Sequence, residues 1–165
     1  MESSVVEVQV RAVLPTSAGS AVFLGNEEKV FVIYVDQFVG SAITMFIHGT
    51  PKPRPQTHDL LADILTSLGA HVQRVVINDF NDGVYFARLI IEAENELEDR
   101  KIIEIDARPS DSIALAVQQE APVYIAGTVW EEVEDMSVVL QKMEEKGLEG
   151  DTGDDDDDIP NFPDL

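Results

Sequence analysis

The stretch HVQRVVINDFNDGVYFARLIIE, residues 71–92, carries the clearest structural signal in this chain. Two runs rich in β-branched and aromatic residues, 71–80 and 84–92, are separated by Asn81, Asp82 and Gly83. An Asn/Asp-Gly turn between two such runs is typical of a β-hairpin, because these residues tolerate the positive φ angles that a tight turn needs. The stretch therefore predicts two long antiparallel strands.

Further strands and helices are predicted on both sides of this hairpin. Runs of β-branched residues indicate strands, whereas apolar residues at helical spacing, bounded by Gly or Pro, indicate helices. The predicted strands are 5–14, 20–24, 29–35, 101–106 and 122–126, and the predicted helices are 37–48, 57–68, 109–119 and 137–146. Because there is no regular βαβ period, we predict a single compact α+β domain with a mixed or mainly antiparallel sheet and packed helices.

The helix predicted over 57–68 follows an extended connector that contains three prolines, Pro51, Pro53 and Pro55. Thr57 is a residue type that caps helix N-termini well, so we expect it to be the N-cap. Five apolar residues of this helix share one face: Leu60, Leu61, Ile64, Leu65 and Leu68. Other apolar segments, above all the strand 84–91 and the helix 37–48, predict a homo-oligomer, with a dimer as the first expectation.

Composition excludes several classes of function. The chain has 165 residues and no cysteine, so disulfides, thiolate metal sites and cysteine nucleophiles are excluded. No run of about 18 apolar residues is present, and the N-terminus lacks the basic and apolar regions of a signal peptide. We therefore expect a soluble, cytoplasmic protein with no membrane span. The net charge of -21 argues against a broad basic surface for nucleic acid.

Nearly half of this charge lies at the C-terminus. Residues 144–165 contain ten acidic residues and one lysine, a net charge of -9, which leaves a domain of residues 1–143. The sequence GDTGDDDDDIPNFPDL predicts a disordered acidic tail, since it has too little apolar surface to offset its ordering entropy. Solubility explains such a tail most simply. Alternatively, Ile159 and Phe162 could anchor it to a protein partner or to this domain's own arginines.

The common nucleotide-binding and hydrolase motifs GxGxxG, GxxxxGK[ST], GxSxG and HExxH are absent from the sequence. Two polar clusters remain, and each opens a predicted helix. One is Arg54-Pro55-Gln56-Thr57-His58-Asp59, and the other is Asp106-Ala107-Arg108-Pro109-Ser110-Asp111.

Both clusters allow a structural and a functional interpretation. Helix capping and pairing of Arg108 with a nearby carboxylate explain the second cluster without any ligand, and this is the simpler interpretation. Alternatively, the helix start and Arg108 would bind a phosphate, or Asp106 and Asp111 would hold a hard cation. In the first cluster, His58 is consistent with a surface residue, a general base or a metal ligand.

Three segments resemble the bifunctional nuclease domain family: RPxTHDL at 54–60, GVYFARLII at 83–91 and DARPSDSIALA at 106–116. The resemblance extends from about residue 5 to residue 140. It implies a compact α+β domain that hydrolyses the phosphodiester bonds of DNA and RNA. A divalent cation, Mg²⁺ or Mn²⁺, is the cofactor to expect.

Carried onto this chain, the resemblance gives eight candidate site residues. The catalytic candidates are His58, Asp59, Asp106, Ser110 and Asp111, and the substrate-binding candidates are Arg54, Thr57 and Arg108. In this hypothesis Asp59, Asp106 and Asp111 share the cation, the two arginines hold the phosphate, and His58 transfers a proton. The alternative is a non-catalytic, oligomeric binding or regulatory module for a small anionic ligand or a protein partner. A site of either kind requires the two clusters to converge.

Overall fold

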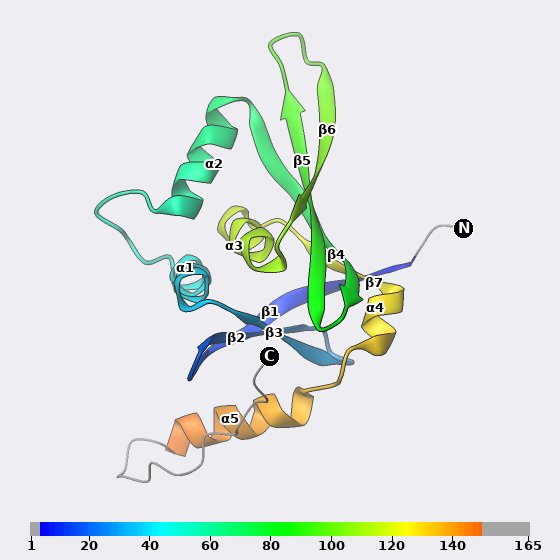
Figure 1. The fold of residues 1–165 in the computed structure, drawn as a ribbon. Coiled ribbons are helices and arrows are strands. Elements are labelled where there is room, and N and C mark those ends of the chain that lie inside the picture. The colour runs from blue at the N-terminus through cyan, green and yellow to red at the C-terminus, as the bar shows by residue number, and fades with distance from the viewer. Residues whose placement is uncertain (1–3, 150–165) are drawn as a thin grey trace.

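The predicted hairpin is present in the computed structural model, which describes residues 4–149 (Figure 1). Strand β4 (Ala70–Asn81) pairs antiparallel with β5 (Val84–Glu94), and Asn81 lies opposite Val84. Asp82 and Gly83 form the turn between them, with φ angles of 50° and 78°. Two positive φ angles are typical of the type I′ turn, whose twist matches that of the two strands.

Seven strands and five helices make up the described residues 4–149. The other strands are β1 (Val5–Thr16), β2 (Gly19–Gly25), β3 (Val30–Val35), β6 (Arg100–Ala107) and β7 (Val123–Ala126). The helices are α1 (Gln37–His48), α2 (Thr57–Ser67), α3 (Pro109–Gln119), α4 (Gly127–Glu132) and α5 (Ser137–Glu149).

The strands form one sheet in the order β3-β2-β1-β7-β4-β5-β6. All neighbouring pairs are antiparallel except β4 and β7, which are parallel. The predicted single α+β domain with a mixed, mainly antiparallel sheet is therefore confirmed.

The sheet curls, so that strands far apart in the sheet order face each other. Four strands separate β3 from β5 in this order, yet the rings of Phe31 on β3 and Tyr85 on β5 have centroids 6.0 Å apart. In Figure 1 the turn end of the hairpin accordingly reaches down to β3. Residues from both ends of the sheet can therefore line one cavity.

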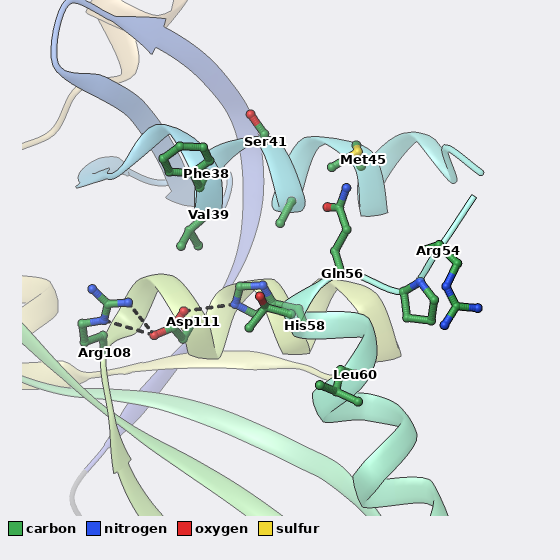
Figure 2. A pocket seen from close by; sticks show the side chains of 13 residues that line it. Phe38, Val39, Ser41, Met45, Arg54, Gln56, His58, Leu60, Arg108 and Asp111 are labelled. Carbon is green, nitrogen blue, oxygen red and sulfur yellow. Dashed lines mark hydrogen bonds and ion pairs between the residues drawn. The ribbon is translucent and has the colours of Figure 1, made fainter. Parts of the chain in front are cut away.

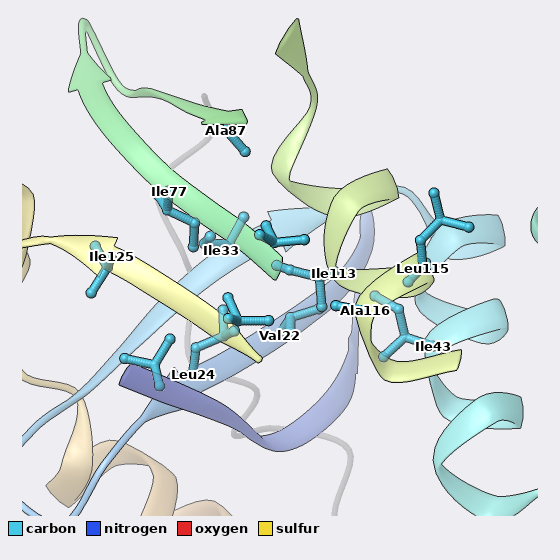
Figure 3. Close-up of a cluster of buried hydrophobic side chains, with 14 of the residues drawn as sticks. Val22, Leu24, Ile33, Ile43, Ile77, Ala87, Ile113, Leu115, Ala116 and Ile125 are labelled. Carbon is cyan, nitrogen blue, oxygen red and sulfur yellow. The ribbon is translucent and has the colours of Figure 1, made fainter. Parts of the chain in front are cut away.

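Helix α3 lies at the centre of the hydrophobic core. Pro109 begins the helix, where its missing N–H is not needed, and Glu120 ends it with a positive φ angle. Ile113, Ala114 and Ala116 are fully buried. Figure 3 shows Ile113 and Ala116 meeting side chains of β2, β3 and α1, including Val22, Ile33 and Ile43. This packing holds the start of α3 in a defined position at the edge of the core.

Three details differ from the sequence-based predictions. The short helix α4 was not predicted. The N-cap of α2 is Gln56 rather than Thr57, because the Gln56 side chain and Asp59 form a capping box. The apolar residues of α2 do not pack as one face into the core: Leu60, Leu61, Ile64 and Leu68 are exposed, and only Leu65 packs against it. Helical periodicity identifies an apolar face but not what covers it.

The last helix of the described residues extends past the predicted boundary between domain and tail. Helix α5 continues to Glu149, six residues beyond the predicted domain boundary at residue 143. The Asp run, Ile159 and Phe162 lie outside the described residues. Among residues 4–149, no helix has the length and apolar character that crossing a membrane requires.

Candidate functional site

The two polar clusters found in the sequence meet at one cavity of about 940 Å³, which we call the histidine cavity (Figure 2). Helix α1 forms one wall, and the starts of α2 and α3 form the other. The lining residues are Phe38, Val39, Ser41, Ala42, Met45, Arg54, Pro55, Gln56, Thr57, His58, Leu60, Arg108 and Asp111.

The local sequence explains why the chain turns back to build this cavity. Helix α1 ends at Gly49, whose φ angle of 60° suits glycine and stops the helix. The proline-containing connector then leads to Gln56, where α2 begins. Pro109 begins α3 shortly after β6 ends, and the starts of α2 and α3 lie next to each other beside α1 (Figure 2).

His58 and Asp111 form the central contact of the cavity. His58 Nε2 lies 3.0 Å from Asp111 Oδ1, although 53 residues separate the two in the chain. His58 is buried, with 7% of its surface exposed. An ionised carboxylate only accepts hydrogen bonds, so Nε2 carries the hydrogen in this contact. In the neutral imidazole, Nδ1 is then the nitrogen that can accept a proton.

Arg108 binds the other oxygen of the same carboxylate. Its Nε and Nη2 atoms donate to Asp111 Oδ2 at 3.1 Å and 2.9 Å. The Arg108 side chain remains 70% exposed, so it also faces the open cavity. Asp111 thus links a buried imidazole to an accessible cation.

Asp59 lies beside the histidine cavity rather than in its lining. Its Oδ2 lies 2.7 Å from Lys52 Nζ and accepts the backbone N–H of Gln56 at 2.9 Å. Burial raises the pKa of Asp59, but the hydrogen bonds and charge of Lys52 and the Gln56 N–H outweigh it, so the pKa lies below its usual value. Asp59 therefore has structural partners for both oxygens, with Gln118 Nε2 at 3.5 Å from Oδ1.

The remaining predicted residues are divided between the histidine cavity and other surfaces. Arg54 and Thr57 line the histidine cavity, and Figure 2 shows Arg54 at the opposite end from Arg108. Ser110 is buried and lines a second cavity. Asp106 is 71% exposed on β6, where it pairs with Arg88 of β5 at 3.5 Å.

This arrangement does not provide the predicted three-carboxylate cation site. Asp59 pairs with Lys52, Asp106 pairs with Arg88, and Asp111 is shared by His58 and Arg108. Within residues 4–149, no three His, Asp or Glu side chains form a group that could hold a metal ion. Each of these three carboxylates therefore has a cationic partner of its own.

Sequence reasoning missed Gln118, which supports the start of α2. Gln118 Nε2 donates to the backbone carbonyl of His58 at 3.3 Å. Gln118 lies seven residues after Asp111, two turns along α3, so both side chains share one face of the helix. That spacing is the signal that could have identified it.

Fold and site together define a compact α+β domain with a cavity built from histidine, aspartate and arginine. The chain belongs to the bifunctional nuclease domain family, whose sequence profile matches residues 22–137. It is also 34% identical over 104 residues to uncharacterised proteins of Mycobacterium tuberculosis strains CDC 1551 / Oshkosh and ATCC 25618 / H37Rv. The match covers 63% of this chain and 58% of the length of each relative.

Proposed function

We propose that this domain hydrolyses phosphodiester bonds of nucleic acid in the histidine cavity. The contact between His58 and Asp111 carries the proposal, because it joins a proton-transferring group to a residue that orients it. Membership of the bifunctional nuclease domain family supports the choice of substrate.

The proposed chemistry assigns a separate role to each residue. Asp111 holds the imidazole of His58 so that Nδ1 accepts a proton from the attacking water. The water oxygen bonds to phosphorus as the bond from phosphorus to the leaving sugar oxygen breaks, and that sugar oxygen takes up a proton from solvent. Arg108 interacts with the negative charge that grows on the phosphate oxygens during the attack. Arg54 contacts a second phosphate at the other end of the cavity. Together the arginines offset, locally, the strongly acidic charge of the chain.

These steps are assigned to side chains alone, because Asp59, Asp106 and Asp111 have separate partners. Dependence on Mg²⁺ or Mn²⁺ therefore stays a prediction, to be measured separately. A cation could also be held jointly by protein and substrate phosphate, as Mg²⁺ often is.

The test is a cleavage assay on single-stranded DNA and RNA with purified full-length protein. We expect the His58→Gln substitution to lower the rate by about 10²- to 10⁴-fold, the range typical of lost general acid–base catalysis. His71→Gln is the matched control, since His71 is exposed on β4 and pairs only loosely with Glu92. Parallel reactions contain Mg²⁺, Mn²⁺ or a chelator.

Equal rates for wild type and His58→Gln would contradict the assignment of His58. If wild type cleaves neither DNA nor RNA under any of these conditions, the hydrolytic proposal fails. The domain would then be the non-catalytic binding module for an anionic ligand.

We further propose that the domain forms a homodimer through α1 rather than through β5. Phe38 and Ile47 on α1 are exposed. On β5, Leu89, Ile90 and Ile91 are buried, and the exposed Val84 and Phe86 lie next to the hairpin turn. Light scattering of wild type and Phe38→Ser would test this. A dimer that Phe38→Ser leaves intact would contradict the role of α1.

A further inference from the structure

A second cavity, of about 480 Å³, shares Arg108 with the histidine cavity. We call it the tyrosine cavity, after Tyr34 of β3 and Tyr85 of β5. Phe80 and Val84 at the hairpin turn and Ser110 at the start of α3 also line it. The proposed chemistry of His58 leaves the tyrosine cavity without a role.

Three aromatic residues, Tyr34, Phe80 and Tyr85, line the tyrosine cavity. The rings of Phe80 and Tyr85 have centroids 4.4 Å apart, and Phe31 supports Tyr85 from the core at 6.0 Å. Tyr34 remains 41% exposed. Rings held in this way by packing offer a flat ligand a contact surface that needs little reordering when it binds.

Both tyrosines keep their hydroxyl proton at physiological pH. Burial, together with the neighbouring Tyr34, raises the pKa of Tyr85 to about 12. Burial and the charge of Glu134 also raise the pKa of Tyr34. Neutral phenols can donate hydrogen bonds to ring nitrogens and carbonyl oxygens, which line the edges of nucleobases.

We infer that the tyrosine cavity binds one base of a single-stranded nucleic acid whose adjacent phosphate contacts Arg108. This inference rests on the proposed function of the histidine cavity. Arg108 lines both cavities, so a nucleotide that spans them would have its phosphate and its base next to one arginine. A base within a duplex is stacked and paired and would have to be flipped out to enter such a cavity, so a single strand is the ligand that enters at the lower cost.

The charge of the protein favours this mode of recognition. Nucleic-acid affinity usually comes from many lysines and arginines on phosphates, but this chain has 11 basic residues against 32 acidic ones. Stacking of bases on aromatic side chains supplies affinity that needs no net positive charge. The tyrosine cavity would compensate in this way for a small phosphate-binding surface.

The experiment compares two pentanucleotides that carry the same phosphates. One is a thymidine pentanucleotide, and in the other every nucleoside is replaced by an abasic tetrahydrofuran. Equilibrium binding is measured with the full chain carrying His58→Gln, so that cleavage of the ligand is slow. We expect the thymidine pentanucleotide to bind about tenfold tighter or more.

A substitution at Tyr34 tests whether the preference for the thymidine pentanucleotide arises in the tyrosine cavity. Adding Tyr34→Ala should weaken binding of the thymidine pentanucleotide about tenfold and leave binding of the abasic one unchanged. Tyr34→Phe keeps the ring and should retain most of the preference. Thermal melting of each variant establishes that it is folded, which is expected because Tyr34 is partly exposed.

The inference is overturned if both pentanucleotides bind equally, if neither binds, or if Tyr34→Ala weakens both to the same extent. It can fail independently of the proposed function. Cleavage by wild type without a preference for bases would leave the histidine cavity as the active site and remove the base-binding role. A preference for bases without cleavage would support the tyrosine cavity and contradict the hydrolytic function.

Discussion

Helices α2 and α3 begin in similar ways, yet their first acidic residues have different partners. Asp59 is the third residue of α2, and Asp111 is the third residue of α3. Each would favour its helix by placing negative charge near the positive end of the helix dipole. Asp59 also binds Lys52 and the Gln56 N–H, whereas Asp111 binds the His58 imidazole and Arg108 in the histidine cavity.

This difference teaches that position in a helix does not determine the role of a carboxylate. The Lys52 side chain is 12% exposed, pairs with Asp59 and lies over the ring of Phe46. The ion pair between Lys52 and Asp59 is therefore enclosed by protein. Arg108 is 70% exposed beside Asp111, so its cation remains accessible to a ligand. We therefore expect Asp59 to contribute to folding stability and Asp111 to contribute to the rate of cleavage.

The largest effect expected from this comparison is on the rate of cleavage. Asp111→Asn should lower kcat by about 10²-fold or more, because a neutral amide no longer fixes the imidazole hydrogen on Nε2. Asp59→Asn, the same chemical change at the matching helix position, should leave kcat within about twofold. Steady-state cleavage of a fluorescent single-stranded oligonucleotide measures both. Equal losses would mean that both carboxylates act in the reaction.

The next largest effect should be on substrate binding, through the cation of each pair. Arg108→Gln should raise KM about tenfold, since hydrogen bonds to charged groups contribute roughly 1.5–3 kcal/mol, and it should also lower kcat, because Arg108 meets the charge that grows during the attack. Lys52→Gln removes the cation beside Asp59 and should leave KM unchanged. The same assay at varied oligonucleotide concentration gives both values. A higher KM for Lys52→Gln would place the Lys52 ion pair in the path of the substrate.

Much of the fold, but only part of the site, could be predicted from the sequence. The turn Asn81-Asp82-Gly83 and Pro109 specify local conformation, so the hairpin and the start of α3 were predicted close to where they lie. Asp59 and Asp111 look alike in the sequence. The partner of Asp59 is Lys52, which the proline-containing connector brings back onto α2, and no local pattern reports such a fold-back.

The tyrosine cavity could not be predicted either, because it depends on a contact between residues far apart in the sequence. Tyr34 and Tyr85 are 51 residues apart, on strands that the sheet order separates widely. Only the curl of the sheet makes them neighbours. Alternation in a strand indicates which residues share a face, but it does not give the curvature that brings two faces together.

A smaller effect should appear in folding stability, and its pH dependence follows from the pKa of Asp59. Asp59→Asn should lower the free energy of unfolding by about 1 kcal/mol at neutral pH, because the capping box and ion pair are weakened. The pKa of Asp59 is lower in the folded state than in the unfolded state. This stabilisation is therefore complete above the unfolded-state pKa and is lost as pH falls through the folded-state value.

Urea denaturation of wild type and Asp59→Asn at several pH values measures this contribution. The difference in unfolding free energy between them should shrink as the pH falls below about 4. A difference that stays constant into acid would mean that the charge of Asp59 does not stabilise the fold.

The smallest expected effect is at Asp106, and it bears on the predicted cation. Asp106 is exposed and pairs with Arg88 at the surface, and such pairs contribute roughly 0–1 kcal/mol. Asp106→Asn should therefore change neither the cleavage rate nor its response to Mg²⁺, with stability within about 0.5 kcal/mol of wild type. Arg88→Gln, which removes the partner, is the matched control. If Asp106→Asn lost Mg²⁺-dependent cleavage but Arg88→Gln did not, the carboxylate of Asp106 would itself bind the cation and would give up its ion pair with Arg88.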